Sequence, residues 1–311
     1  YFHSYIHPVP GTHSYTVYAC LGEAHIDATL LRDVPRTGGK SPKESYYDTP
    51  TGRVVVKKRT GLVVFSTSSA RYVIGDILKH FNQVVNTIEQ LYIEHYHDAG
   101  LVLLHAAAVA DANGRGVLIS SASGVGKSSA ALATLERGFH FLSNDRVLLQ
   151  AAEDETRVIG IPKKPRINPG TALALPSLQQ LLSEQERARY LAMDRAVLWR
   201  LERKLDVDVD AVYGEGTTVL EAPLVLIFLL EWSPFDGQPL FEELDNGEAA
   251  RQLDRHMLGA GPYRSIRTAT SGSPDLAMVT CQATCFRVRG GVDLPAFARH
   301  VVNRLGEELA I

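Results

Sequence analysis

The stretch SASGVGKSS, residues 121–129, restricts the fold of this chain more than any other part of its sequence. It follows the pattern G-x4-G-K-[ST] except at its first position, where Ser121 stands in place of glycine. That pattern forms a phosphate-binding loop only between a strand and the start of a helix. The apolar run GVLIS precedes it, and KSSAALATLERG follows with helix-forming residues and a glycine stop. We therefore expect a strand–loop–helix unit that binds a nucleotide.

The residues of this loop have separate physical tasks. Its backbone N–H groups converge on phosphate oxygens, and the positive end of the helix adds to their effect. Lys127 would place its charge on the outer phosphates, and the Ser128 hydroxyl is a hard oxygen ligand of the kind that Mg²⁺ prefers. Ser121 would cost about 1 kcal/mol if its φ were positive. The expected nucleotide-binding residues are Ser123, Gly124, Val125, Gly126, Lys127, Ser128 and Ser129.

A carboxylate stands where such a loop needs one. Asp145 lies eighteen residues after Lys127, at the end of the expected strand FHFLS. Sites that transfer phosphate through Mg²⁺ commonly use a second protein oxygen of this kind. We expect Ser128 and Asp145 to hold Mg²⁺ beside ATP, the alternative being that Asp145 is an ordinary turn residue.

The remaining pattern predicts a mixed α/β protein with two parts. Residues 1–100 are β-rich to about Ser69, and helical spacing over residues 72–97 predicts one long helix, the alternative being an interruption near Gly75. Residues 101–311 are expected to form the nucleotide-binding catalytic domain. This second part should contain two strands joined by an Asn-Gly turn, the loop and its helix, a core strand over residues 222–232, and a C-terminal amphipathic helix capped by Asp293.

Composition excludes several classes of function. The chain has 311 residues and a net charge of −3, so no basic field argues for nucleic acid. No apolar segment is long enough for a membrane helix. Three cysteines are too few for a disulfide framework, and a cytoplasmic protein is expected. Alternation around Cys281 and Cys285 predicts a strand that buries both thiols.

Residues 101–150 resemble the catalytic domain of the HPr kinase/phosphorylase family, and more closely its HPr-kinase-related members. The resemblance rests on the run SASGVGKSSAALATLERGFHFLSNDRVLL and on the upstream strand LLHAAAV. It implies an HPr-kinase/PEP-carboxykinase-like P-loop nucleotide domain that uses ATP and Mg²⁺. It also points to His105, because the family has a histidine on the corresponding strand.

Two positions depart from the family pattern. The family has two adjacent aspartates after the strand, one assigned to general-base work and the other near the metal, whereas this sequence has Asn144 followed by Asp145. Asn cannot accept a proton as a carboxylate does, so either Asp145 or His105 would be the base. The family's glutamate after the loop serine is Ser129 here.

We thus expect a kinase that transfers the γ-phosphate of ATP to a hydroxyl, with Asp145, His105 and Lys127 as catalytic residues. The acceptor would be a peptide or protein serine or a small molecule. Arg166, in the basic loop GIPKKPRINPG, is expected to grip phosphate. A nucleotide-binding regulatory protein and an ATPase without transfer activity are the alternatives. Neither a nucleic-acid nor a membrane partner is expected, and the oligomeric state, a homo-oligomer included, stays open.

Overall fold

A computed structural model describes residues 2–5, 14–35, 41–234, 237–259 and 276–308. The chain divides into two compact units. One unit comprises residues 14–100 within the described ranges, and the other comprises residues 101–258 with the described residues from both ends of the chain.

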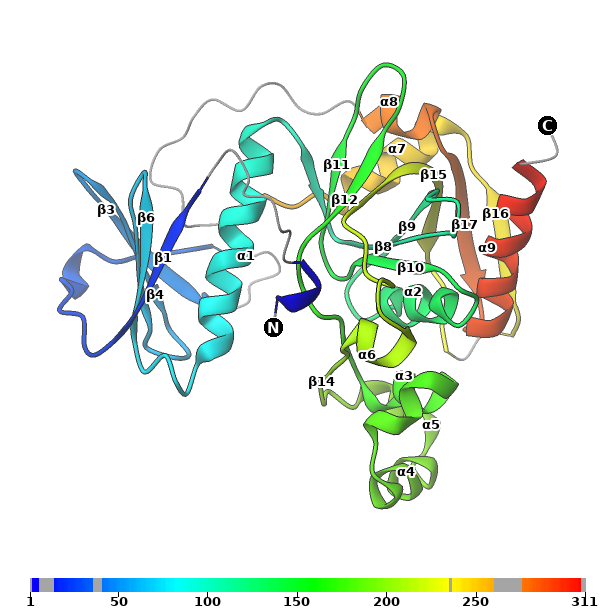
Figure 1. Cartoon of the computed structure of the whole chain (residues 1–311), viewed down its shortest axis with the longest axis horizontal. Coiled ribbons are helices and arrows are strands. Elements are labelled where there is room, and N and C mark those ends of the chain that lie inside the picture. Colours follow the sequence, from blue (N-terminus) through cyan, green and yellow to red (C-terminus); the bar gives the residue numbers. More distant parts are fainter. Residues whose placement is uncertain (1, 6–13, 36–40, 235–236, 260–275, 309–311) are drawn as a thin grey trace. The chain divides into compact units, whose positions relative to one another are not determined.

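The unit of residues 14–100 is a six-stranded sheet with one long helix (Figure 1). Its strand order is β1-β6-β5-β4-β3-β2, in which only β1 and β6 run parallel. One face carries Val55, Val64 and Val73, which pack with Val84 of the helix into a small core. The elements are β1 (Thr16–Leu21), η2 (Ala28–Leu30), β2 (Arg32–Asp33), β3 (Glu44–Thr49), β4 (Gly52–Lys57), β5 (Val63–Ser66), β6 (Ala70–Gly75) and α1 (Phe81–Asp98).

The helix expected over residues 72–97 is only partly correct. Residues 72–75 belong to strand β6, which pairs with β1 on one side and β5 on the other, and α1 begins at Phe81. Tyr72, Val73 and Ile74 have the aromatic and branched side chains that suit a strand, and pairing on both sides outweighs their helical spacing. Tyr72 stacks on Tyr18 across the strands with ring centroids 4.8 Å apart.

The other unit is built on a nine-stranded sheet. Seven of its strands follow the order β10-β8-β9-β15-β12-β11-β7. Strand β17 also pairs with β15, and β16 pairs with β17. Strand β15 pairs with β12, β9 and β17, the last two in parallel, so it is the centre of the sheet. The strands are β7 (Val102–Leu104), β8 (Ala106–Ala110), β9 (Gly116–Ser120), β10 (His140–Ser143), β11 (Val147–Gln150), β12 (Arg157–Gly160), β15 (Glu221–Leu230), β16 (Pro239–Glu243) and β17 (Thr284–Gly290); a separate pair is β13 (Arg166–Ile167) and β14 (Leu205–Asp206).

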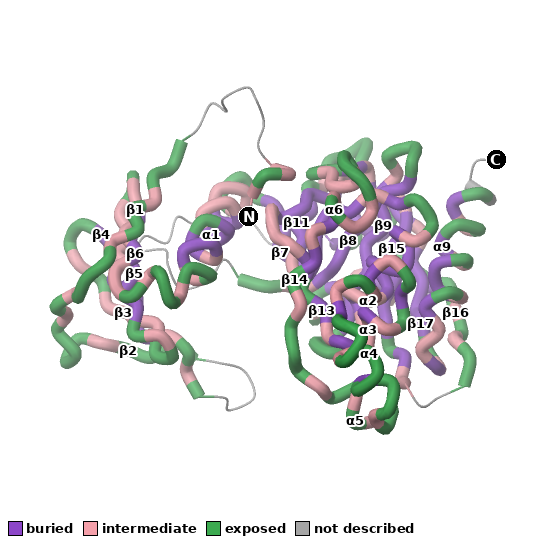
Figure 2. The backbone as a smooth tube through the Cα atoms, turned by 60° about the horizontal axis from the view of Figure 1, so that its bottom comes forward, coloured by how far each residue is buried: buried purple, intermediate pink, exposed green. Residues whose placement is uncertain are grey.

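Helices cover both faces of this sheet, which explains why its central strands are buried along their whole length (Figure 2). Alternate residues of β15 divide between two cores: Phe228 packs with α2 and α9, and Ile227 packs with α7 and α8. The mixed α/β class expected from the sequence is confirmed. The helices are η1 (His3–Tyr5), α2 (Lys127–Leu135), α3 (Pro169–Ala174), η4 (Pro176–Leu181), α4 (Glu184–Leu191), α5 (Arg195–Arg200), α6 (Val209–Tyr213), α7 (Asn246–Asp254), α8 (Leu276–Cys281) and α9 (Leu294–Glu308).

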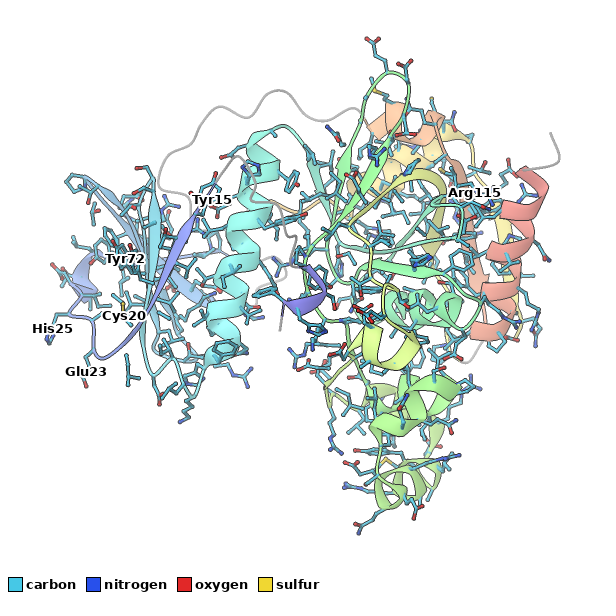
Figure 3. All side chains as sticks on the ribbon, viewed as in Figure 1. Tyr15, Cys20, Glu23, His25, Tyr72 and Arg115 are labelled. Carbon is cyan, nitrogen blue, oxygen red and sulfur yellow. The ribbon has the colours of Figure 1, made fainter. Side chains whose placement is uncertain are left out.

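The turn between β8 and β9 forms as the Asn-Gly pair predicts. Asp111 accepts hydrogen bonds from the backbone N–H groups of Asn113 and Arg115, and the strands pair antiparallel from this turn. Arg115, labelled in Figure 3, lies beside α9 and donates to the Leu305 carbonyl oxygen at 2.9 Å. The expected C-terminal helix is confirmed too, because Asp293 accepts from the Ala296 N–H at 2.8 Å.

The strand predicted around the two neighbouring cysteines is half wrong. Cys281 ends helix α8 and is exposed, and only Cys285 lies in strand β17, where it is 2% exposed. Short-range alternation misled the sequence interpretation, since the chain turns sharply between the two residues. Burial raises the pKa of the Cys285 thiol to about 12, and the nearby Cys281 and Glu243 act in the same direction.

The two thiols should therefore differ strongly in reactivity. At about pH 8 the Cys285 thiol stays protonated, because this pH lies far below its raised pKa, and a protonated buried thiol is a poor nucleophile. We expect an aromatic disulfide reagent to label Cys281 rapidly and Cys285 only after unfolding, as measured by mass spectrometry. Labelling in guanidinium should reach every cysteine, and equal native rates at Cys281 and Cys285 would contradict the burial.

Among the described residues, no helix combines the length and apolar character needed to cross a bilayer.

Candidate active site

Strand directions bring the predicted site residues to one edge of the nine-stranded sheet. Strand β8 runs antiparallel to both β9 and β10, so β9 and β10 end at the same edge where β8 begins. The loop follows β9, Asp145 follows β10, and His105 directly precedes β8. Together with Lys127 and Ser128, these residues line a cavity of about 740 Å³.

The loop adopts a conformation that needs no strain at Ser121. Gly124 and Gly126 have φ values of 84° and 116°, in the region that favours glycine, whereas Ser121 is not among the described residues with positive φ. The cost considered for a serine in the first position therefore does not arise. Gly126 is the N-cap of α2, so the positive end of this helix begins at the loop.

Lys127 is 6% exposed, and its ammonium group is held by the loop itself. Nζ donates to the carbonyl oxygens of Ser121 at 3.0 Å and Ala122 at 3.1 Å. Burial lowers the pKa of the Lys127 ammonium to about 8, although the Asp145 carboxylate opposes this shift. The loop thus carries a buried cation whose desolvation an anionic ligand would offset.

Ser128 and Asn144 form a direct hydrogen bond between the loop helix and the end of β10. The Ser128 hydroxyl donates to Asn144 Oδ1 at 2.6 Å. Because the proton points toward Asn144, the lone pairs of the Ser128 oxygen are left to face a cation. Asn144, which departs from the family pattern, therefore has a positioning contact of its own.

Asp145 has an unusual backbone. It is the one non-glycine residue with positive φ in the described part of the chain, at 75°. Asp tolerates this region better than most residues, and such strain clusters at functional sites. Its Oδ1 lies 3.4 Å from His105 Nε2. Partial burial opposes ionisation, but the hydrogen bond from His105 and the charges of Arg146 and Lys163 outweigh it and lower the pKa of the Asp145 carboxyl to about 2.

The basic loop after β12 also reaches the cavity. Lys163, Lys164 and Arg166 all line it, as the sequence suggested. Arg166 is half exposed and lies 3.1 Å from Asp206, and Lys164 lies 2.8 Å from Asp208. For Arg166 to bind phosphate, as the sequence predicted, it would have to give up its ion pair with Asp206.

Trp232 is a site residue that the sequence analysis did not identify. It follows β15, whose parallel pairing with β9 brings it beside the loop. Its Nε1–H donates to the Val125 carbonyl oxygen at 2.7 Å, and a Cβ on Gly126 would lie 3.4 Å from the same nitrogen. Trp232 is 4% exposed and packs edge-on against Phe297. The indole therefore holds the loop in place through this hydrogen bond. No local sequence pattern predicts the contact.

Replacing the indole by a phenyl ring tests this contact. Trp232→Phe keeps an aromatic ring against Phe297 but removes the donor to Val125. We expect ATP–Mg²⁺ to bind about three- to tenfold more weakly, because one hydrogen bond to a backbone carbonyl is lost. Calorimetric titration measures the change, and thermal unfolding of the same variant controls for altered packing. Unchanged affinity would show that the loop needs no such support.

Comparison with known proteins finds one partial sequence similarity. No family model matches the sequence. The HPr kinase/phosphorylase of Limosilactobacillus reuteri (strain DSM 20016) is 32% identical over 132 residues, which are 42% of this chain and 32% of that protein. Over these residues the chain is similar to HPr kinase/phosphorylase. The resemblance inferred from the loop and its flanking strands is thereby confirmed.

The relationship covers only part of each protein. The chain matches about a third of the length of its curated relatives, and the protein of L. reuteri subsp. reuteri (strain JCM 1112) gives the same values. The solved HPr(Ser) kinase/phosphatase from Coxiella burnetii is 14% identical, with a TM-score of 0.36 over 67% of this chain and 99% of that one. This global structural correspondence is loose.

Proposed function

We propose that this chain is an ATP-dependent kinase that transfers the γ-phosphate to a hydroxyl. The observation that carries the proposal is the convergence of Lys127, Ser128, Asp145 and His105 on one cavity. Phosphoryl transfer needs positioning and charge neutralisation more than covalent chemistry. A phosphate loop with a buried cation, next to a carboxylate–histidine pair, supplies both.

Each residue has a role that its contacts support. The loop N–H groups and Lys127 bind the β- and γ-phosphates. Ser128 and Asp145 are oxygen donors that fit Mg²⁺, and the nucleotide phosphates and water would complete its ligands. When bound, this ion would neutralise charge on the transferred phosphate. The acceptor proton goes to the Asp145–His105 pair, in which Oδ1 of Asp145 lies 3.4 Å from Nε2 of His105.

The test is transfer of label from γ-³²P-ATP with Mg²⁺ to an acceptor in cell extract, run beside Lys127→Ala. A labelled product that depends on Lys127 supports the kinase. Stoichiometric release of phosphate without a labelled acceptor would indicate an ATPase instead. Nucleotide binding with neither product nor phosphate release would indicate a regulatory protein and overturn the proposal.

A further inference from the structure

Cations line the cavity in two distinct groups. Lys127 is held by loop carbonyls, Lys164 and Arg166 are paired with aspartates, and Lys163 contributes its charge to Asp145. Arg195 and Lys204 also line the cavity, but in the part of the chain that the structure describes their side chains have neither a hydrogen bond nor an ion pair. These two positive charges are thus left to a ligand.

Packing of α5 against α3 brings the unpaired arginine to the cavity. A Cβ on Gly170 would lie 3.6 Å from Leu198, so the face of α5 that carries Leu198 is turned toward the start of α3. Arg195 lies three residues before Leu198 and four before Trp199, so its side chain neighbours both on the helix surface. All three residues line the cavity. The neighbouring Thr171 hydroxyl lies 2.6 Å from that of Ser129, which links this region to the loop helix.

The second cation arrives through the short β13–β14 pair. Arg166 pairs with Asp206 and Ile167 with Leu205, so the next residues in this register are Asn168 and Lys204. Oδ1 of Asn168 is buried and has no hydrogen-bond partner among the described residues, although Asn168 lines the cavity. An acceptor of hydrogen bonds and a cation are therefore adjacent, and neither is satisfied by the chain.

Arg195 lies in the first turn of α5, directly after the residue that caps this helix. The Asp194 carboxylate accepts hydrogen bonds from the Ala196 and Val197 N–H groups. Among the described residues it forms no ion pair with the Arg195 guanidinium, which is exposed and open to an anion in the cavity.

We propose that Arg195 and Lys204, with Asn168, form a subsite for an anionic group on the phosphate acceptor. This inference rests on the proposed kinase function and narrows the acceptor to a hydroxyl compound that also carries a carboxylate or phosphate. The anion binds the two cations, Asn168 accepts a hydrogen bond from a polar group of the same molecule, and Trp199 covers its apolar part. The acceptor hydroxyl then lies toward the loop end of the cavity.

Binding of small probes tests the subsite without requiring transfer. With the loop filled by a non-hydrolysable ATP analogue and Mg²⁺, calorimetry compares glycerate and glycerol 3-phosphate with uncharged glycerol. We expect the two anions to bind and glycerol not to. Arg195→Ala and Lys204→Ala should each weaken anion binding about tenfold, because each removes a charge-assisted contact. Arg200→Ala is the matched control, since Arg200 is exposed on the same helix but does not line the cavity.

The binding measurements can support or overturn the proposed anion subsite. Equal affinity in all variants, or no binding of either anion to the native protein, would overturn the subsite. So would loss of affinity for the ATP analogue itself, since these cations would then serve the nucleotide. Calorimetry with the capped peptides Gly-Asp-Ser-Gly and Gly-Asn-Ser-Gly identifies the source of the anion. Tighter binding of the aspartate peptide would indicate an acidic peptide, and equal weak binding of both would indicate a small acid. Anion binding together with no labelled product from γ-³²P-ATP in the extract assay would preserve the subsite and overturn the kinase.

Discussion

Lys127→Ala is expected to lower phosphoryl transfer by about a hundred- to thousandfold, and to weaken ATP–Mg²⁺ binding as well. Lys127 is the buried cation of the loop, and removing one donor to developing charge in a water-poor site has effects of this size. The cavity retains other cations, but Lys164 and Arg166 are already paired with aspartates. Transfer is measured with labelled ATP, and binding is measured by calorimetry.

Control variants must separate the loss of the Lys127 charge from a change in the loop conformation. Lys127 also donates to the Ser121 and Ala122 carbonyls, so its removal leaves these oxygens without that partner. Lys127→Arg keeps the charge but not the geometry and should recover binding better than transfer. Arg137→Ala removes an exposed cation just beyond α2 and should leave both quantities unchanged. Full activity in Lys127→Ala would exclude the loop as the phosphate site.

Asp145→Asn is expected to lower transfer by at least about a hundredfold, a loss typical for a group that positions metal or proton. The carboxyl pKa of about 2 keeps Asp145 ionised at neutral pH, so the substitution removes a full charge. Asn also tolerates the left-handed backbone at this position, and the fold should therefore be preserved. The assay follows labelled product over a range of Mg²⁺ concentrations.

Further variants distinguish a metal-binding role of Asp145 from a role in proton transfer. Partial rescue by excess Mg²⁺ would mark Asp145 as a metal ligand. If Asp145 and His105 act as one unit, Asp145→Asn combined with His105→Asn should lose little more than either single variant. Asp154→Asn makes the same chemical change on an exposed turn and serves as the control. Transfer at the native rate in Asp145→Asn would remove Asp145 from the mechanism.

Local patterns predicted the centre of the nine-stranded sheet well. The run GVLIS, the Asn-Gly turn and the helix ended by Gly138 all form as expected, because each depends on residues close in sequence. Failures occurred where tertiary pairing decides. Residues 72–75 have a helical pattern but become a strand between two partners, and Cys281 falls in a short helix because the chain turns before β17.

The sequence located part of the candidate site because those residues are close in sequence, and it missed residues that come from distant segments. Lys127, Ser128 and Asp145 lie in one strand–loop–helix–strand unit, so spacing alone was enough to select them. Trp232 and Arg195 come from segments far along the chain, and only strand order and helix packing bring them to the cavity. A single tryptophan after an apolar run gives no signal of its own, and Arg195 resembles any surface arginine.

The placement of the indoles has a practical consequence. The chain has two tryptophans, and both line the same cavity, Trp232 behind the loop and Trp199 on the α5 face. All indole emission of this chain therefore originates at the candidate site. Trp232 would report on the loop and Trp199 on the proposed acceptor region, so single replacements would separate the two signals. Ligand occupancy could then be followed by intrinsic fluorescence in unlabelled protein.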